Sequence, residues 1–158
     1  MRKTIVPKLS YSDNMIDKKK LTMCLTFKVV IDYKLAPILD SLYKKSSRCV
    51  TRMLEHRDRS SSKYYKSIPC VLAKGLIQKY QKNKKIKTAR HIVLPICGDK
   101  GKQVKLVRNG IRVPSVFKKT VIPVLFSKPI IGYIRQVEFF KRNKQWFMAY
   151  SYNTPCLS

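Results

Sequence analysis

One strand-like segment stands alone near the amino terminus of this 158-residue chain, and it constrains how the rest can fold. Residues 21–32 are apolar and partly β-branched, which is typical of a β-strand. The next strand-like pattern begins only at His91, after two segments with helical periodicity. Because a lone strand leaves its backbone hydrogen bonds unpaired, residues 21–32 need partners from the carboxyl-terminal part of the chain. The sequence therefore predicts a helical insertion, over about 34–88, within a β-structure.

The first segment of the insertion, residues 35–57, carries apolar residues at spacings of three and four, which predicts an amphipathic helix. Pro37 falls in its first turn, where a missing N–H is tolerated, and Ser46 occupies one core-facing position. The opposite face is basic and meets either solvent or a ligand. Its members are Lys44, Lys45, Arg48 and Arg52.

A second helix is predicted to follow a short serine-rich linker. It starts near Ser67, with Pro69 in its first turn, and ends in a basic turn that begins at Gln81. Gly75 lies inside it and weakens it, since glycine is a poor helix former.

From about residue 90 to 155 the pattern is strand-like. The dipeptide Asn109-Gly110 predicts a tight hairpin, and residues 121–126 predict an edge strand because of their prolines. Residues 133–140 and 145–152 predict a long hairpin, with Trp146 on one face of its second strand and Phe147 on the other. The expected fold class is α+β: a small antiparallel β-barrel, wedge-like, interrupted by the helical insertion. Residues 1–20 are expected to be a loose basic leader, and residues 21–158 one split domain.

The chain carries 35 Lys plus Arg against 8 Asp plus Glu, a formal net charge of +27. Only Asp99 and Glu138 are acidic after residue 58. Its hydrophobic content of 44% is too high for a disordered basic tail, so the charge belongs to a folded body. Such a body repels itself and favours a polyanionic partner, most commonly RNA or DNA. We expect no membrane segment and no small-molecule substrate.

Five cysteines occur without any CxxC pair, and their odd number does not suit a disulfide framework. We interpret them as reduced, mostly buried thiols of a cytoplasmic protein. The residues also give little basis for catalysis. Glu55, His56 and Asp58 are interpreted as a charged helix surface, and residues 98–102 as a surface turn. We expect no catalytic residue, no metal site and no cofactor.

The residues that suit nucleic-acid binding are basic and lie in several short runs. Phosphate contacts are expected from Lys82, Lys84, Lys85, Lys87, Arg90, Lys102, Lys105, Arg108, Arg112, Lys118, Lys119, Arg135, Lys141, Arg142 and Lys144. Tyr64, Tyr65, Tyr133 and Trp146 are candidates for stacking on unpaired bases, although the core is the favoured place for Trp146 and most other aromatic residues.

Several segments together resemble the amino-terminal part of the TnpB family, the RNA-guided nucleases of insertion sequences. They are the strand LTFKVVID, the helices LAPILDSLYKKSSRCVTRML and SIPCVLAKGLIQKYQKN, the strand HIVLPI, and the hairpins VKLVRNGIRVPS and IGYIRQVEFFKRNKQWFMAYSYNTP. The last hairpin, with a basic turn before its Trp strand, is the most specific, and the resemblance spans roughly residues 21–155.

The resemblance implies a wedge-like β-barrel with a helical recognition insertion that holds guide RNA and target DNA. It also implies a RuvC-like nuclease domain, which none of the 158 residues resembles, so a separately encoded RuvC-like half is a possible partner. The expected function is therefore that of a transposon protein fragment that binds structured RNA, duplex DNA or both without cleaving them. The alternative is an unrelated basic RNA- or DNA-binding protein, ribosome-associated or viral.

Overall fold

The amino-terminal strand pairs with a carboxyl-terminal strand, as predicted, and its partner is the last strand of the chain. The computed structural model describes residues 22–57, 61–88 and 90–156, so the expected leader lies outside the described residues. Strand β1 (Thr22–Val30) runs antiparallel to β7 (Gln145–Pro155) along its whole length, from the Thr22↔Pro155 pair to the Val30↔Phe147 pair.

Two further strands complete this sheet. Strand β7 also pairs with β6 (Ile131–Arg142), which pairs in turn with β2 (Leu94–Cys97). All pairs are antiparallel, and the order is β1-β7-β6-β2. The long hairpin turns at Asn143 and Lys144, whose φ angles of 51° and 66° are those of a tight two-residue turn.

The described strands do not form the closed barrel that the sequence predicted. Strands β3 (Lys105–Val107), β4 (Gly110–Arg112) and β5 (Val121–Pro123) form a separate three-stranded sheet, with β5 at an edge as expected. A barrel needs one continuous, staggered sheet. Here the small strands have three residues each, and β6 has register irregularities between Ile131 and Gln136, so the described part contains two open antiparallel sheets.

The hairpin of β3 and β4 is present, but its glycine has a different role from the predicted one. Val107 pairs with Gly110, so the turn residues are Arg108 and Asn109. A Cβ atom on Gly110 would lie 2.0 Å from the carbonyl oxygen of Ile122. The glycine is therefore needed because β5 passes close to β4.

The helices confirm the predicted insertion and correct its details. Helix α1 (Ala36–Glu55) has Pro37 in its first turn and buries Ser46. Helix α2 (Cys70–Leu76) begins later than predicted, because Pro69 is its amino-terminal cap rather than a first-turn residue. It continues as a π-helical turn, Ile77–Gln81. A short helix, α3 (Pro114–Phe117), was not predicted.

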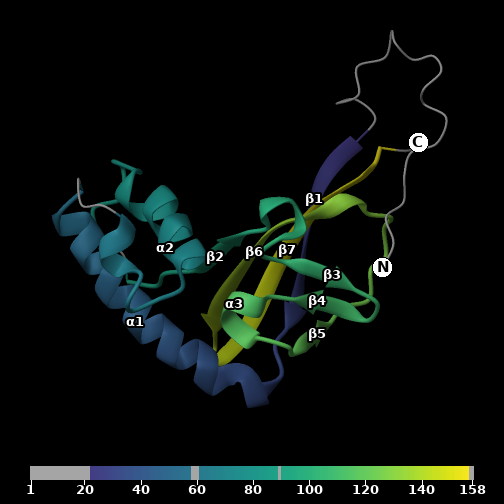
Figure 1. Cartoon of the computed structure of the whole chain (residues 1–158), viewed down its shortest axis with the longest axis horizontal. Coiled ribbons are helices and arrows are strands. Elements are labelled where there is room, and N and C mark those ends of the chain that lie inside the picture. The colour runs from purple at the N-terminus through teal and green to yellow at the C-terminus, as the bar shows by residue number, and fades with distance from the viewer. Residues whose placement is uncertain (1–21, 58–60, 89, 157–158) are drawn as a thin grey trace, which may run out of the picture.

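The three-stranded sheet and α3 pack against one face of the four-stranded sheet, while α1 and α2 lie toward one end of it (Figure 1). Phe117 meets Phe139 edge-on at 5.5 Å between ring centroids, and Phe126 contacts the rings of Tyr150 and Tyr152. Alternate residues of β7 are buried on this face, as the period of two predicted. The buried residues of β7 on this face are Trp146, Met148, Tyr150, Tyr152 and Thr154.

The prediction of mostly buried thiols was wrong. Only Cys49, on α1, is buried, whereas the other four are exposed: Cys24, Cys70, Cys97 and Cys156. Burial raises the pKa of the Cys49 thiol, since a thiolate is poorly solvated in the core.

Candidate nucleic-acid interface

The basic residues proposed from sequence lie at the surface, but not on one surface. All of them are exposed except Arg112, which is half-buried. Fourteen of them form three groups, on the loop after α2, on and beside the small sheet, and at the tip of the β6–β7 hairpin, while Arg135 lies within β6.

The loop after α2 is held by Arg57, which no sequence pattern singled out. The Arg57 guanidinium donates hydrogen bonds to the carbonyl oxygens of Tyr80, Gln81, Asn83 and Ile86. These carbonyls belong to the end of the π-helical turn and to the loop, where helix geometry leaves oxygens without intrahelical partners. One guanidinium therefore fixes the path of the backbone that follows α2.

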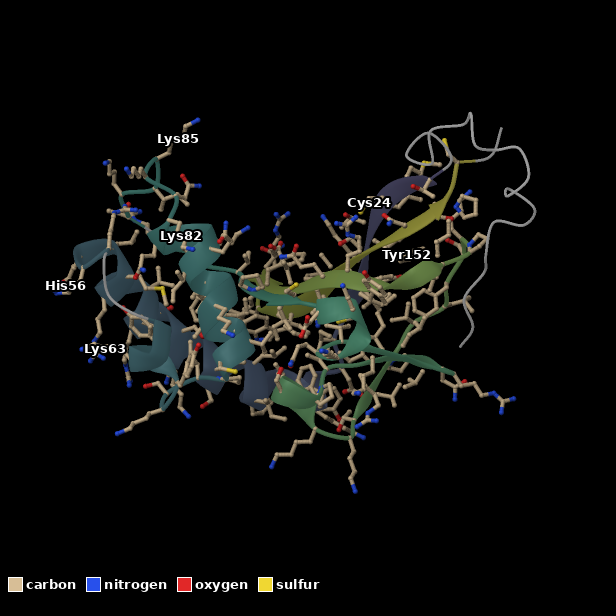
Figure 2. All side chains as sticks on the ribbon, turned by 45° about the horizontal axis from the view of Figure 1, so that its top comes forward. Cys24, His56, Lys63, Lys82, Lys85 and Tyr152 are labelled. Atoms are coloured by element: carbon tan, nitrogen blue, oxygen red, sulfur yellow. The ribbon has the colours of Figure 1, made fainter. Side chains whose placement is uncertain are left out.

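The backbone carbonyls of this loop are bound by Arg57, whereas the lysine side chains of the loop are exposed to solvent. The exposed cations of this basic loop, residues 82–90, are Lys82, Lys84, Lys85, Lys87 and Arg90. Figure 2 shows Lys82 and Lys85 at the same end of the molecule as His56 and Lys63, and far from Cys24 and Tyr152. No acidic residue occurs between positions 59 and 98, so this end is strongly positive.

The small sheet carries a second basic group. Lys105 and Arg112 are cross-strand partners, and Nη2 of Arg112 donates to the carbonyl oxygen of Lys118 at 3.4 Å. Arg108 lies at the opposite end of this hairpin, in its turn. Lys102 and Lys119 are exposed on the turns that flank the sheet.

At the hairpin tip, Lys141 and Arg142 are adjacent in sequence but face opposite sides of the sheet. Lys141 donates to Asp40 at 2.9 Å, and Nε1 of Trp146 donates to the same oxygen at 2.9 Å. These two hydrogen bonds hold the pKa of Asp40 below its ordinary value. Lys141 is thus engaged within the protein and ties the hairpin to α1, while its neighbour Arg142 points to the other face of the sheet.

We call that other face the open face, because the small sheet and α3 cover the opposite one. Helix α2 and the π-helical turn reach the open face at β2, where Gly75 lies against Pro95 and Lys79 pairs with Glu138. The residues of the open face are those of odd number in β7 and their strand neighbours, arranged in rows across the sheet. One row is Val30, Phe147 and Phe140; the next is Lys28, Ala149, Glu138 and Pro95; the next is Thr26, Ser151, Gln136 and Cys97. Arg135 belongs to this side too, since its Nη1 donates to Oδ1 of Asn153 at 3.5 Å.

The aromatic candidates divide between core and surface. Trp146 and Tyr64 are both about 1% exposed, so neither ring can stack on a base. Tyr65 and Tyr133 are exposed at 38% and 40%. Phe140, Phe147 and Lys28, which share the open face, were not among the candidates that the sequence patterns indicated. Strand alternation predicted that Phe147 and Trp146 face opposite sides of the sheet. Only the strand register shows that Phe147 lies beside Phe140 and near Lys28.

The described residues contain two Lys–carboxylate ion pairs, Lys79–Glu138 at 3.2 Å and Lys141–Asp40 at 2.9 Å. Within the same part of the chain, no three His, Cys, Asp or Glu side chains come together as metal ligands. His56 ends α1, and Asp99 is in the surface turn predicted for residues 98–102, whereas Asp58 lies outside the described residues. None of the described helices is long and apolar enough to span a bilayer.

Comparison of the chain with protein-family models, with curated proteins and with solved structures gave no match.

Proposed function

We propose that this protein binds nucleic acid, structured RNA, duplex DNA or both, through its basic surface, and does not cleave it. The observation that carries the proposal is that the positive charge is not neutralised internally. The two Lys–carboxylate ion pairs of the described residues use only Lys79 and Lys141, while the other candidate cations, apart from the half-buried Arg112, are exposed. A phosphate backbone supplies the missing negative charge and releases counterions on binding.

The basic loop is the first anchor in this proposal. It places several cations on a backbone that Arg57 holds, and a fixed loop loses less conformational entropy on binding than a free one. Phosphate contacts of this kind position the protein without reading sequence.

The resemblance to TnpB proteins gives the proposal its finer form. In that form the four-stranded sheet and its companion sheet act as the wedge-like body, and α1 and α2 act as the recognition insertion. A RuvC-like half encoded elsewhere would supply the nuclease. The proposed binding needs only the charged surfaces, and not a closed barrel.

The test compares two quadruple variants of equal charge. One changes Lys82, Lys84, Lys85 and Lys87 to Gln, and the other changes Lys44, Lys45, Arg48 and Arg52, on the exposed face of α1, to Gln. Affinities for a labelled RNA hairpin and a DNA duplex are measured over a series of salt concentrations. We expect the loop variant to bind at least about tenfold more weakly and to lower the salt slope by about 3, with a smaller change for the α1 variant.

Equal losses in both variants would mean that binding is spread over the whole charge and not anchored in the loop. Absence of binding by the wild-type protein at low salt would overturn the proposed function itself. Cutting of either ligand in Mg²⁺ or Mn²⁺ would overturn the statement that the protein does not cleave.

Sequencing the RNA that co-purifies with the protein separates the two versions of the proposal. One small structured RNA favours the TnpB-like version. Bulk ribosomal RNA favours an unrelated basic protein.

A further inference from the structure

The open face carries a stacked aromatic pair. Phe140 and Phe147 are cross-strand partners in β6 and β7, with ring centroids 5.4 Å apart and planes inclined by 15°. Both rings are part-exposed, and Val30, the next residue in the same row, is 56% exposed. The row is therefore a flat apolar strip beside rows that also carry charged and polar side chains, among them Lys28, Glu138 and Gln136.

Two cations lie against this strip. Nζ of Lys28 is 5.7 Å from the centroid of the Phe140 ring, and Cζ of Arg142 is 5.3 Å from it. Both distances are in the range of cation–π attraction, which holds the charged groups beside the rings. Neither residue takes part in the ion pairs of the described residues, so both charges remain available to a ligand.

The surface around the strip is hollowed. One hollow of about 260 Å³ is lined by Lys28, Arg142 and both phenylalanines, and a neighbouring one of about 660 Å³ extends over Thr26 and Ala149. Small side chains in the rows beside the rings, Ala149 and Ser151, leave room above the sheet. A flat group can therefore reach the rings from solvent.

We propose that the open face binds a single-stranded segment of nucleic acid, with a base against the Phe140–Phe147 pair and phosphates at Lys28 and Arg142. This inference rests on the proposed function and deepens it. A duplex stacks its bases on one another and presents mainly phosphate, whereas an unpaired base offers its flat face to an aromatic ring. Rings beside unpaired cations complement an unpaired nucleotide, which is both flat and anionic.

The experiment measures the affinity of the whole chain for three labelled probes by fluorescence anisotropy. They are oligo(U) and oligo(dT) of about twelve nucleotides, and a blunt RNA duplex of equal length. The variants are Phe140→Leu, Phe147→Leu and the double variant K28Q/R142Q. Tyr33→Leu, a 77% exposed aromatic outside the strands, and K44Q/K45Q serve as matched controls. Fluorescence of Trp146 and the unfolding midpoint verify that each variant is folded.

We expect each Phe→Leu change to weaken binding of the single-stranded probes about tenfold, with the duplex affected less than twofold. K28Q/R142Q weakens single-strand binding and lowers its salt slope by about 1 to 2. The preference between oligo(U) and oligo(dT) identifies whether RNA or DNA is the natural strand. If the wild type binds the duplex but not the single strands, or if folded Phe→Leu variants bind them unchanged, this inference is overturned while the proposed function stands. Binding of no probe overturns both.

Discussion

At the scale of residues, one arginine determines the geometry of the most basic loop. Arg57 reaches four backbone carbonyls across a gap of 23 to 29 residues in sequence. A charge-assisted hydrogen bond contributes about 1.5–3 kcal/mol, and partners left without a donor are costly. No local sequence pattern distinguishes this arginine from Arg52 or Arg59, because its partners come from a separate helix.

Replacement of Arg57 by Ala is expected to lower the free energy of unfolding by about 2 kcal/mol. Arg57→Lys recovers only part of this, since a lysine ammonium lacks the planar fork that serves several carbonyls. Urea unfolding followed by the fluorescence of Trp146 measures both, and limited proteolysis reports on the loop at 82–88. An unchanged urea midpoint in R57A would contradict the anchoring role.

Asp40 makes stability depend on pH in a defined direction. Hydrogen bonds from Lys141 and Trp146 lower its pKa in the folded state, so its contribution is complete above the unfolded pKa of about 4. The contribution is lost as the pH falls through the lower folded pKa. The carboxylate is part-exposed, and solvent screening limits the effect to less than about 1 kcal/mol.

We therefore expect Asp40→Asn to be less stable than the wild type at neutral pH, with a difference that narrows below about pH 4. Asparagine still accepts from the Trp146 indole, so the variant isolates the loss of charge. Urea midpoints measured from pH 7 to pH 3 test this. A difference that stays constant over that range would show that the carboxylate charge plays no part.

At the scale of elements, the sequence patterns predicted which segments are helices and strands, while contacts set their limits. Helix α1 and the long hairpin follow from periods of 3.6 and 2, and both were predicted to within a few residues. Helix α2 was predicted as one regular helix, yet it ends in a π-helical turn. Helix α2 also packs closely against β2 at Gly75. A Cβ atom on this residue would lie 2.5 Å from the carbonyl oxygen of Pro95.

The variant Gly75→Ala tests this close approach. Helix propensity alone predicts a gain of about 1 kcal/mol for Ala over Gly. The contact with Pro95 instead predicts a loss of about 1–3 kcal/mol, because backbone atoms must move to admit the methyl group. Lys74→Ala, at the adjacent exposed position, is the control and should be nearly neutral. The midpoint of thermal unfolding shows whether G75A is stabilised or destabilised. A stabilised variant would rule out tight contact between α2 and β2 at this position.

At the scale of the whole molecule, the charge of +27 acts on every property at once. A folded body of this charge is destabilised by self-repulsion, which salt screens over about 10 Å at 0.1 M. We expect the midpoint of thermal unfolding to rise with added NaCl in the absence of nucleic acid. At low salt, poly(U) should raise the midpoint further, since a ligand that prefers the folded state stabilises it. A midpoint that falls with NaCl would contradict this.

The sequence could not predict which of the candidate cations are available to a ligand. The candidate site was predicted as one list of cations, and nearly all are exposed as expected. The sequence did not distinguish Lys141, which binds Asp40, from Arg142, which lies against the Phe140 ring. Neighbouring strand residues face opposite sides, so which of them meets a ligand depends on what covers each side.

The sequence by itself determined the order of the main elements, the need of the first strand for carboxyl-terminal partners, and the excess of positive charge, because these depend on periodicity and composition. Only the tertiary structure decided that the strands form two open sheets, that Arg57 holds the basic loop, and that two phenylalanines and two cations meet on the open face. Those outcomes depend on contacts between residues far apart in the chain. Such contacts are set by the packing of the whole fold and leave no signature in any short stretch of sequence.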